Sequence, residues 1–289
     1  MGADLNQLLP SREPGRRTRL LGILNLTPDS FHDGGIDATV EESVRRARRM
    51  VEAGADAIDL GAESSRPGAD PVPVEEELRR ILPVLERLRD LGVPLSVDTV
   101  KAEVARRALS AGAHWINDIS GLTADPAMAG VCAAAGCPVI LMHMRGSPRT
   151  MQKHADYDDV VEDVRAELAA RADDAVRAGI RADRIVLDPG IGFAKTPEQS
   201  FRLLRDLDRI RSLGFPVLVG ASRKSFLRKA SGDETADRLP GTLAVSCWAV
   251  RSGAEILRVH DVAENLAAVR TTEALLGESA MRSTVEERC

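Results

Sequence analysis

One local pattern recurs along the chain and limits the folds that the chain can adopt. At seven places a helical stretch ends at a glycine, and a short aliphatic run follows within a few residues. Glycine suits the position just past a helix because it takes the left-handed conformation without a Cβ clash. The runs that follow these glycines read AIDLG, PLSVD, HWINDIS, PVILMH, RIVLD, PVLVG and EILRV. With the opening run LLGILN at residues 20–25, they predict eight strands that alternate with helices.

The composition of these runs predicts how the strands are arranged. They are nearly continuous in apolar residues, which is typical of parallel strands buried on both faces. Amphipathic stretches between them predict helices over residues 41–53, 74–91, 101–111, 158–178, 198–213 and 262–276. Eight strand-then-helix units within 289 residues predict an α/β fold of one domain, the (β/α)8 TIM barrel. The alternative, an open doubly wound sheet, usually carries a glycine-rich dinucleotide fingerprint after its first strand, and none stands there.

The barrel is expected to span residues 19–277, between two segments of different character. Residues 1–18, which include Pro10 and Pro14, are expected to form an N-terminal extension. Residues 278–289 are polar and are expected to form a C-terminal tail. Both tryptophans, Trp115 and Trp248, are expected in the core.

Composition and charge disfavour several classes of protein. With 44 acidic and 39 basic residues the net charge is −5, so the chain has no general attraction for nucleic acid or an anionic membrane. Aromatic residues make up 3%, which leaves few platforms for stacking nucleic-acid bases. No run approaches 18 apolar residues, the first twenty residues lack the apolar block of a signal peptide, and the four cysteines lack metal-binding spacing. We therefore expect a soluble, cytoplasmic protein.

Polar residues gather at the ends of the predicted strands, where chemistry takes place in a barrel of this kind. A first set combines carboxylates, an amide and an ammonium group: Asp98, Asn117, Asp188 and Lys224. Such a set suits a flat heterocycle with several N–H donors and a carbonyl, because each buried polar edge needs a partner. One or two strand-end residues, such as Asp118 or Asp261, also have an ordinary explanation as helix N-caps. For His143 we expect a packing or hydrogen-bonding role.

A second set of rim residues offers cations and an oxygen ligand. Its members are Asn25, Arg66, Arg223, Arg258 and His260. Arginine forks match phosphate oxygens, and Mg²⁺ prefers oxygen ligands shared with a substrate phosphate. The two sets together predict a site for a heterocycle linked to a phosphate or diphosphate.

Eight sequence motifs identify a family resemblance. They read GILNLTPDSFHDGG (22–35), DLGAESSRPGA (59–69), SVDT (96–99), NDISG (117–121), LMHMRGSPRTMQ (141–152), LDPGIGFAKT (187–196), GASRKSFL (220–227) and RVHDV (258–262). In this order they resemble the dihydropteroate synthase family of pterin-binding barrels, over almost the whole barrel. Members of that family join a pterin CH₂-diphosphate to 4-aminobenzoate, releasing diphosphate and forming 7,8-dihydropteroate for folate synthesis.

The resemblance implies roles for individual residues. As catalytic residues it implies Asp98, Asp188, Lys224, Arg258 and His260. As substrate-binding residues it implies Thr27, Phe31, Ser65, Arg66, Pro67, Asn117, Met142, Phe193, Ser222 and Arg223. It further implies Asn25 as a ligand of Mg²⁺, the expected cofactor, and a homodimer as the assembly. Ser65 and Ala194 stand where the family commonly has threonine and glycine, and neither change removes a charge or a ligand.

Two other functions are compatible with parts of this pattern. A methyltetrahydrofolate:corrinoid methyltransferase shares the Asp and Asn contacts to a pterin, but it has no use for the phosphate-binding cations. A non-catalytic pterin-binding paralogue would be expected to have lost residues from the first loop or from the SRPG motif, and the chain keeps both.

Overall fold

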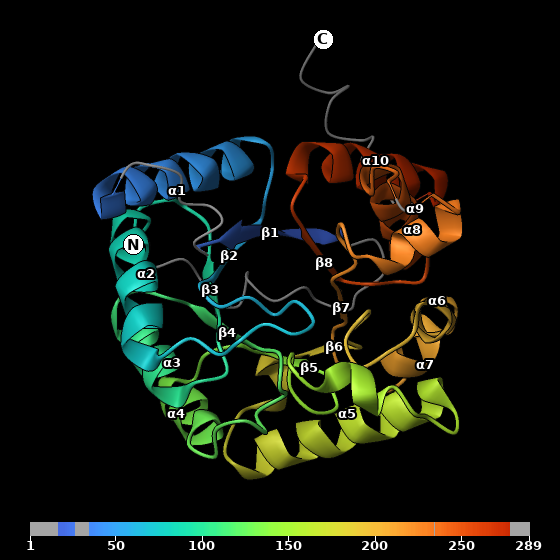
Figure 1. The fold of residues 1–289 in the computed structure, drawn as a ribbon, viewed down its shortest axis with the longest axis horizontal. Coiled ribbons are helices and arrows are strands. Elements are labelled where there is room, and N and C mark those ends of the chain that lie inside the picture. The colour runs from blue at the N-terminus through green and yellow to red at the C-terminus, as the bar shows by residue number, and fades with distance from the viewer. Residues whose placement is uncertain (1–16, 27–34, 234, 278–289) are drawn as a thin grey trace.

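The strands form a closed ring surrounded by helices (Figure 1). The computed structural model describes residues 17–26, 35–233 and 235–277. Eight parallel strands are hydrogen-bonded in the order β6-β5-β4-β3-β2-β1-β8-β7. A bridge between Leu187 and Val217 joins the two edges and completes the circle. The predicted (β/α)8 barrel is therefore confirmed.

Each predicted run contains one strand. The strands are β1 (Arg19–Asn25), β2 (Ala57–Gly61), β3 (Leu95–Asp98), β4 (Trp115–Asp118), β5 (Val139–Met142), β6 (Ile185–Asp188), β7 (Leu218–Val219) and β8 (Ile256–Val259). The first strand begins at the predicted start of the barrel. Most of the predicted N-terminal extension and all of the predicted C-terminal tail lie outside the described residues.

Each predicted amphipathic segment contains a helix. The helices are α1 (Gly35–Glu52), α2 (Val74–Arg87), α3 (Ala102–Ser110), α4 (Met128–Ala135), α5 (Val160–Arg177), α6 (Pro197–Arg205), α7 (Leu207–Arg211), α8 (Phe226–Ser231), α9 (Leu239–Arg251) and α10 (Val262–Leu275), with short 3-10 turns at Met151–His154 and Ala182–Arg184. Of these, helices α4, α8 and α9 lie outside the predicted segments. The single helix predicted over 198–213 is two helices, because Asp206 between them leaves the helical conformation (φ −105°, ψ 32°). Among the described residues, no helix is long and apolar enough to cross a membrane.

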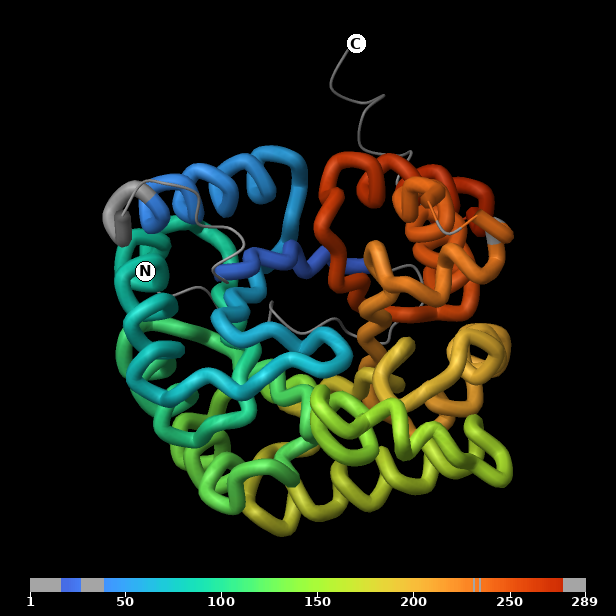
Figure 2. The backbone as a smooth tube through the Cα atoms, viewed as in Figure 1, coloured from blue at the N-terminus to red at the C-terminus, as the bar shows by residue number. Residues whose placement is uncertain are grey.

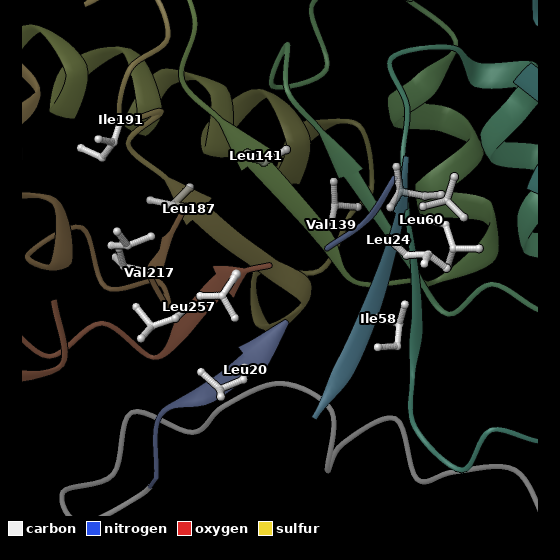
Figure 3. Close-up of a cluster of buried hydrophobic side chains, with 14 of the residues drawn as sticks. Leu20, Leu24, Ile58, Leu60, Val139, Leu141, Leu187, Ile191, Val217 and Leu257 are labelled. Atoms are coloured by element: carbon white, nitrogen blue, oxygen red, sulfur yellow. The ribbon is translucent and has the colours of Figure 1, made fainter. Parts of the chain in front are cut away.

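The hydrophobic core has two layers, one on each side of the strands. Outward-facing strand residues such as Leu24, Ile58 and Leu187 share one cluster with buried residues of the helices. Figure 3 shows the side chains of these strand residues. Inward-facing residues fill the barrel and form what we call the interior layer: Leu21, Ala57, Trp115, Ile140, Val186, Leu218 and Ile256. Every strand except β3 supplies one of these side chains, so the barrel interior is packed at this level.

One predicted core residue is not in the core. Trp115 is buried as expected, but the side chain of Trp248 on α9 is 40% exposed. Its ring is held by polar groups instead: Nε1 donates to the carbonyl oxygen of Leu204 at 2.8 Å, and the Arg251 guanidinium lies 5.2 Å from the ring centroid. The prediction for Trp248 is wrong because the indole N–H is satisfied at the junction of α9 with α6, which leaves the ring at the surface.

Candidate active site

The alternation of side chains along each strand determines which polar residues meet. Successive side chains of a strand point to opposite faces, so the residue two positions after an inward one also points inward. Two positions beyond the interior layer, toward the C-terminal ends of the strands, stand Asp59, Asn117, Met142, Asp188 and Arg258. Asp98, paired in register with Asn117, belongs to the same level. We call these six side chains the rim layer.

Arg258 joins three strands of the rim layer. Its Nε donates to Oδ2 of Asp59 at 2.6 Å, and its Nη2 donates to Oδ2 of Asp98 at 2.8 Å. Asn117 Nδ2 also donates to Oδ2 of Asp59, at 3.0 Å, which directs the Asn117 amide oxygen away from that carboxylate. Asp59 lies in the predicted strand run AIDLG but is not among the predicted site residues. Its inward position in the alternation of β2 is the signal that identifies it.

Burial changes the protonation of the rim carboxylates. Removal from water raises the pKa of Asp98 to about 7, and the nearby Asp59 carboxylate adds to the rise while Arg258 opposes it. Burial likewise raises the pKa of Asp188, against the opposing charge of Lys224 and the backbone N–H of Gly190. In the free protein, Asp98 is thus close to half-protonated at neutral pH.

The raised pKa of Asp98 predicts a pH-dependent stability. Because the folded protein holds this proton up to about pH 7 and the ordinary value is 3.8, the native state binds more protons between these limits. The contribution of Asp98 to the free energy of unfolding should therefore be greatest below pH 4 and decline as the pH rises to 7. Urea unfolding at several pH values checks this by comparing wild type with Asp98→Asn. Parallel pH profiles for the two proteins would contradict it.

Lys224 and Phe193 form the next part of the site, beside Asp188. The Lys224 ammonium lies 4.2 Å from the centroid of the Phe193 ring and donates to the carbonyl oxygen of Ile191. Burial lowers the pKa of Lys224 to about 8, and Asp188 limits that fall. The Gly190 N–H donates to Oδ1 of Asp188 at 2.7 Å. The structure thus brings the predicted Asp188, Phe193 and Lys224 together.

A glycine leaves room above the interior layer on β7. Gly220 follows that strand at the rim level, where a Cβ atom would lie 3.7 Å from Oδ2 of Asp188 and 3.8 Å from Cβ of Arg258. Any longer side chain would therefore fill the space between these two residues.

Ser222 and His260 come together at the ends of β7 and β8. The Ser222 hydroxyl lies 2.9 Å from Nδ1 of His260 and accepts the His260 backbone N–H at 3.1 Å. Burial and the neighbouring Arg258 lower the pKa of His260 to about 4, so the ring is neutral at pH 7. Arg223, in contrast, turns its guanidinium to Asp261 in a two-pronged ion pair of 2.7 and 2.6 Å. Its role in substrate binding stays a prediction.

The segment after β2 carries three more predicted residues, Ser65, Arg66 and Pro67. In Figure 2 the tube of residues 62–73 extends from the strand end across the middle of the view. The segment is fixed at both sides: Lys101 pairs with Glu63, and the Gly68 N–H donates to the carbonyl oxygen of Pro148 at 3.1 Å. Arg66 and Pro67 are exposed and Ser65 is half-buried.

Three predicted residues lie at or beyond the end of β1. Asn25 ends the strand, is half-buried and pairs in register with Gly61. Thr27 and Phe31 lie outside the described residues. Within the described ranges, no group of three or more His, Cys, Asp or Glu side chains is placed to hold a metal ion.

Comparison with known proteins agrees with this geometry. The sequence matches the family described as "Pterin binding enzyme" over residues 21–260. It is 49% identical over 250 residues to a dihydropteroate synthase from Synechocystis, covering 86% of each chain. Two structures from Xanthomonas albilineans are also similar. Dihydropteroate synthase with 4-aminobenzoic acid has a TM-score of 0.84 at 45% identity, covering 91% of this chain and 94% of that one. Its complex with 7,8-dihydropteroate has a TM-score of 0.81 at 42% identity, covering 91% and 95%.

The barrel, its polar rim layer and the family match define the class of protein as a pterin-binding enzyme. Within that class, the identity over most of the chain is decisive, and the chain belongs to the dihydropteroate synthase family.

Proposed function

We propose that this enzyme joins (7,8-dihydropterin-6-yl)methyl diphosphate to 4-aminobenzoate, forming 7,8-dihydropteroate and diphosphate. The observation that carries the proposal is the rim layer. Three carboxylates, an amide and a guanidinium group from separate strands meet at one level above a packed interior. Rigid strand ends hold polar groups in fixed directions, which suits a flat ring with several donors and acceptors. The family match supports the same reaction.

The pterin ring is assigned to Asp98, Asn117, Asp188 and Lys224. The carboxylates of Asp98 and Asp188 accept N–H groups of the ring, and the Lys224 ammonium donates to a ring acceptor. The Asn117 amide is already oriented, because its NH₂ group donates to Asp59. Met142 and Phe193 line the same pocket, with the Arg258 guanidinium held flat by Asp59 and Asp98.

The diphosphate is assigned to Arg66, Arg258 and His260, with Ser222 and Arg223 beside them. Since His260 is neutral, we assign it the tautomer with its proton on Nε2, and the Ser222 hydroxyl donates to Nδ1. In this form His260 binds the diphosphate as a hydrogen-bond donor. We assign 4-aminobenzoate to the segment of Ser65 and Pro67, with Thr27 and Phe31.

The reaction needs no covalent bond to the protein. The amine nitrogen of 4-aminobenzoate attacks the methylene carbon of the pterin, and the C–O bond to diphosphate breaks. The electron pair of that bond stays on the diphosphate oxygen, and the nitrogen loses a proton. Arg66, Arg258 and His260 stabilise the charge that develops on the leaving group. Asp98 and Asp188 stabilise positive charge on the conjugated pterin.

The donor set fits magnesium that is shared with the substrate. Mg²⁺ keeps several waters and is commonly bound by one or two protein oxygens plus substrate phosphates. Asn25 offers a single amide oxygen at the end of β1, next in register to β2. When bound, the ion would supply positive charge to the diphosphate. We therefore propose Mg²⁺ as the cofactor, with Asn25 as its protein ligand.

Replacing Asn25 with alanine is expected to raise the Mg²⁺ concentration required for half-maximal turnover. A lost oxygen ligand weakens metal binding, whereas the pterin ring rests on other strands and should bind normally without metal. Magnesium titrations of turnover, together with calorimetry of 6-hydroxymethyl-7,8-dihydropterin in EDTA, measure the two effects. The same magnesium dependence in wild type and Asn25→Ala would count against this ligand.

Assembly and location are further parts of the proposal. We propose a homodimer, supported by the family membership and by the exposed large apolar residues Trp248 and Leu276. Light scattering should give twice the chain mass. We also propose a cytoplasmic location, supported by the free thiols of Cys132, Cys137 and Cys247, which a reducing compartment maintains. Cell fractionation tests it.

The proposed function is tested by identifying the product. Purified enzyme with both substrates and Mg²⁺ should form 7,8-dihydropteroate, detected by mass spectrometry. Omission of either substrate should abolish it. A protein that binds the pterin with no turnover would instead be the non-catalytic paralogue.

A further inference from the structure

The turn between β6 and α6, residues 189–195, contacts the proposed pterin pocket at three points. The Gly190 N–H donates to Asp188, and the Ile191 carbonyl accepts a hydrogen bond from Lys224. The ring of Phe193 lies beneath the Lys224 ammonium. The position of this turn therefore decides where two of the proposed pterin-binding side chains stand.

A buried lysine, Lys195, connects this turn to the end of a neighbouring strand. Lys195 is 3% exposed, and its Nζ lies 2.9 Å from the carbonyl oxygen of Phe193, 2.9 Å from Nδ1 of His143 and 3.5 Å from the His143 carbonyl oxygen. Burial lowers the pKa of Lys195 well below its usual range, and the charge of Asp188 opposes this fall. A lysine amine carries two N–H donors when neutral and three when charged, so in either form Nζ can donate both to the Phe193 carbonyl and to His143. His143 directly follows β5, so Lys195 ties the turn after β6 to the end of the neighbouring strand.

The protonation of Glu167 and His143 determines which atom donates in the hydrogen bond between His143 and Lys195. The His143 side chain is fully buried, and its Nε2 lies 3.0 Å from Oε2 of Glu167 on α5. The hydrogen bond with His143 and the Arg145 guanidinium lower the pKa of Glu167 to about 2, so this carboxylate accepts and does not donate. Burial and the charge of Lys195 lower the pKa of His143 to about 3. The neutral ring therefore carries its proton on Nε2, and Nδ1 accepts from Lys195.

The backbone of the turn is itself constrained. Ala194 adopts a left-handed conformation (φ 49°), which L-residues take at a cost, and its carbonyl oxygen accepts the Tyr157 hydroxyl at 2.9 Å. At Gly190 the backbones touch, because a Cβ atom there would lie 1.9 Å from the His143 carbonyl oxygen. The turn is thus pressed against the end of β5 at Gly190 and held by side chains at Ala194 and Phe193.

We propose that Lys195 is a positioning residue: by joining the Phe193 carbonyl to His143, it places the Phe193 ring and the Ile191 carbonyl against Lys224. The consequence for binding rests on the proposed function, since it takes Lys224 and Phe193 as pterin contacts. Lys195 itself acts only through the turn, with Glu167 and His143 fixing the acceptor that it uses.

The variant Lys195→Met keeps a long apolar chain and removes every N–H donor of the side chain, whereas Lys195→Gln restores amide donors. The matched control is Glu255→Gln, a buried carboxylate at the opposite end of the barrel that accepts the Val217 N–H at 2.8 Å. The first readout is an NMR measurement that needs no ligand. It records the chemical shifts of the lysine side-chain methylene groups, and the ring current of Phe193 should move those of Lys224 upfield. This shift should be lost in Lys195→Met, partly recovered in Lys195→Gln and retained in Glu255→Gln.

The second readout is calorimetry with two probes, 6-hydroxymethyl-7,8-dihydropterin and inorganic diphosphate with Mg²⁺. Lys195→Met should weaken pterin binding at least tenfold and change diphosphate binding less than twofold, with Lys195→Gln in between. Retention of the Lys224 shift in Lys195→Met would overturn the proposal. An equal loss of both affinities would overturn it as well, because it would show a general disturbance of the site. Loss of the shift with normal pterin affinity would support the positioning of Phe193 and contradict the assignment of the pterin ring to Lys224.

Discussion

Replacing Arg258 with methionine is expected to lower the free energy of unfolding by about 3–5 kcal/mol, the usual cost of removing one partner of a buried ion pair. The guanidinium contacts Asp59, which is fully buried, and Asp98, whose side chain is 14% exposed. Methionine fills similar space but leaves both carboxylates without their cation. Urea unfolding at pH 7 measures the loss as a lower midpoint.

Two further variants make this expectation specific. In Arg258→Met combined with Asp59→Asn, part of the loss should be recovered, because the fully buried carboxylate that has lost its cation is then gone. The control Arg79→Met removes the surface pair of Arg79 with Glu76 and should leave the urea midpoint almost unchanged, because exposed ion pairs contribute little to stability. An effect of Arg258→Met as small as that of the control would show that the rim layer does not depend on this arginine.

Replacing Asp188 with asparagine is expected to weaken pterin binding by about 1.5–3 kcal/mol, roughly 10- to 150-fold. The amide keeps an oxygen for the Gly190 N–H, so the turn should stay folded. It loses the negative charge that faces Lys224 and that we assign to the N–H groups of the ring. Calorimetry with 6-hydroxymethyl-7,8-dihydropterin measures the change.

Asp118 provides the matched control for this variant. It also ends a strand and is buried, but it alternates with Asn117 and accepts hydrogen bonds from Ser120 instead of facing the barrel interior. Asp118→Asn should therefore change pterin affinity less than twofold. Equal losses in the Asp118 and Asp188 variants would mean that the rim layer has no special part in pterin binding.

The fold follows from local features that one sequence displays. Helix-ending glycines and continuous aliphatic runs predict every strand, because parallel strands buried on both faces need that composition. The membership of the rim layer follows from the alternation of side chains along each strand, which also identifies Asp59. Helices α4 and α9 are indicated only by the glycines that follow them, because their sequences, MAGVCAAA and LPGTLAVSCWAVR, lack the distinct polar face of an amphipathic segment.

The pairing of the polar side chains could not be predicted in the same way. Arg258 and Asp59 are 199 positions apart, so only the closed barrel brings them together. Arg223 matches a phosphate-binding motif, yet its guanidinium pairs with Asp261 at the end of the next strand. Lys195 stands in the glycine-rich motif LDPGIGFAKT with no predicted role, whereas the fold buries it against His143. Such contacts depend on which strand ends become neighbours in space.

The central claim is that the rim layer binds a pterin whose diphosphate is displaced by an arylamine. The most direct measurement is the release of diphosphate by the purified enzyme with Mg²⁺, the pterin diphosphate and 4-aminobenzoate. The account predicts release that requires both substrates, matches the 7,8-dihydropteroate formed one to one, and falls at least tenfold in kcat/KM for Asp188→Asn. Release at the same rate without 4-aminobenzoate, or an unchanged kcat/KM in Asp188→Asn, would contradict it.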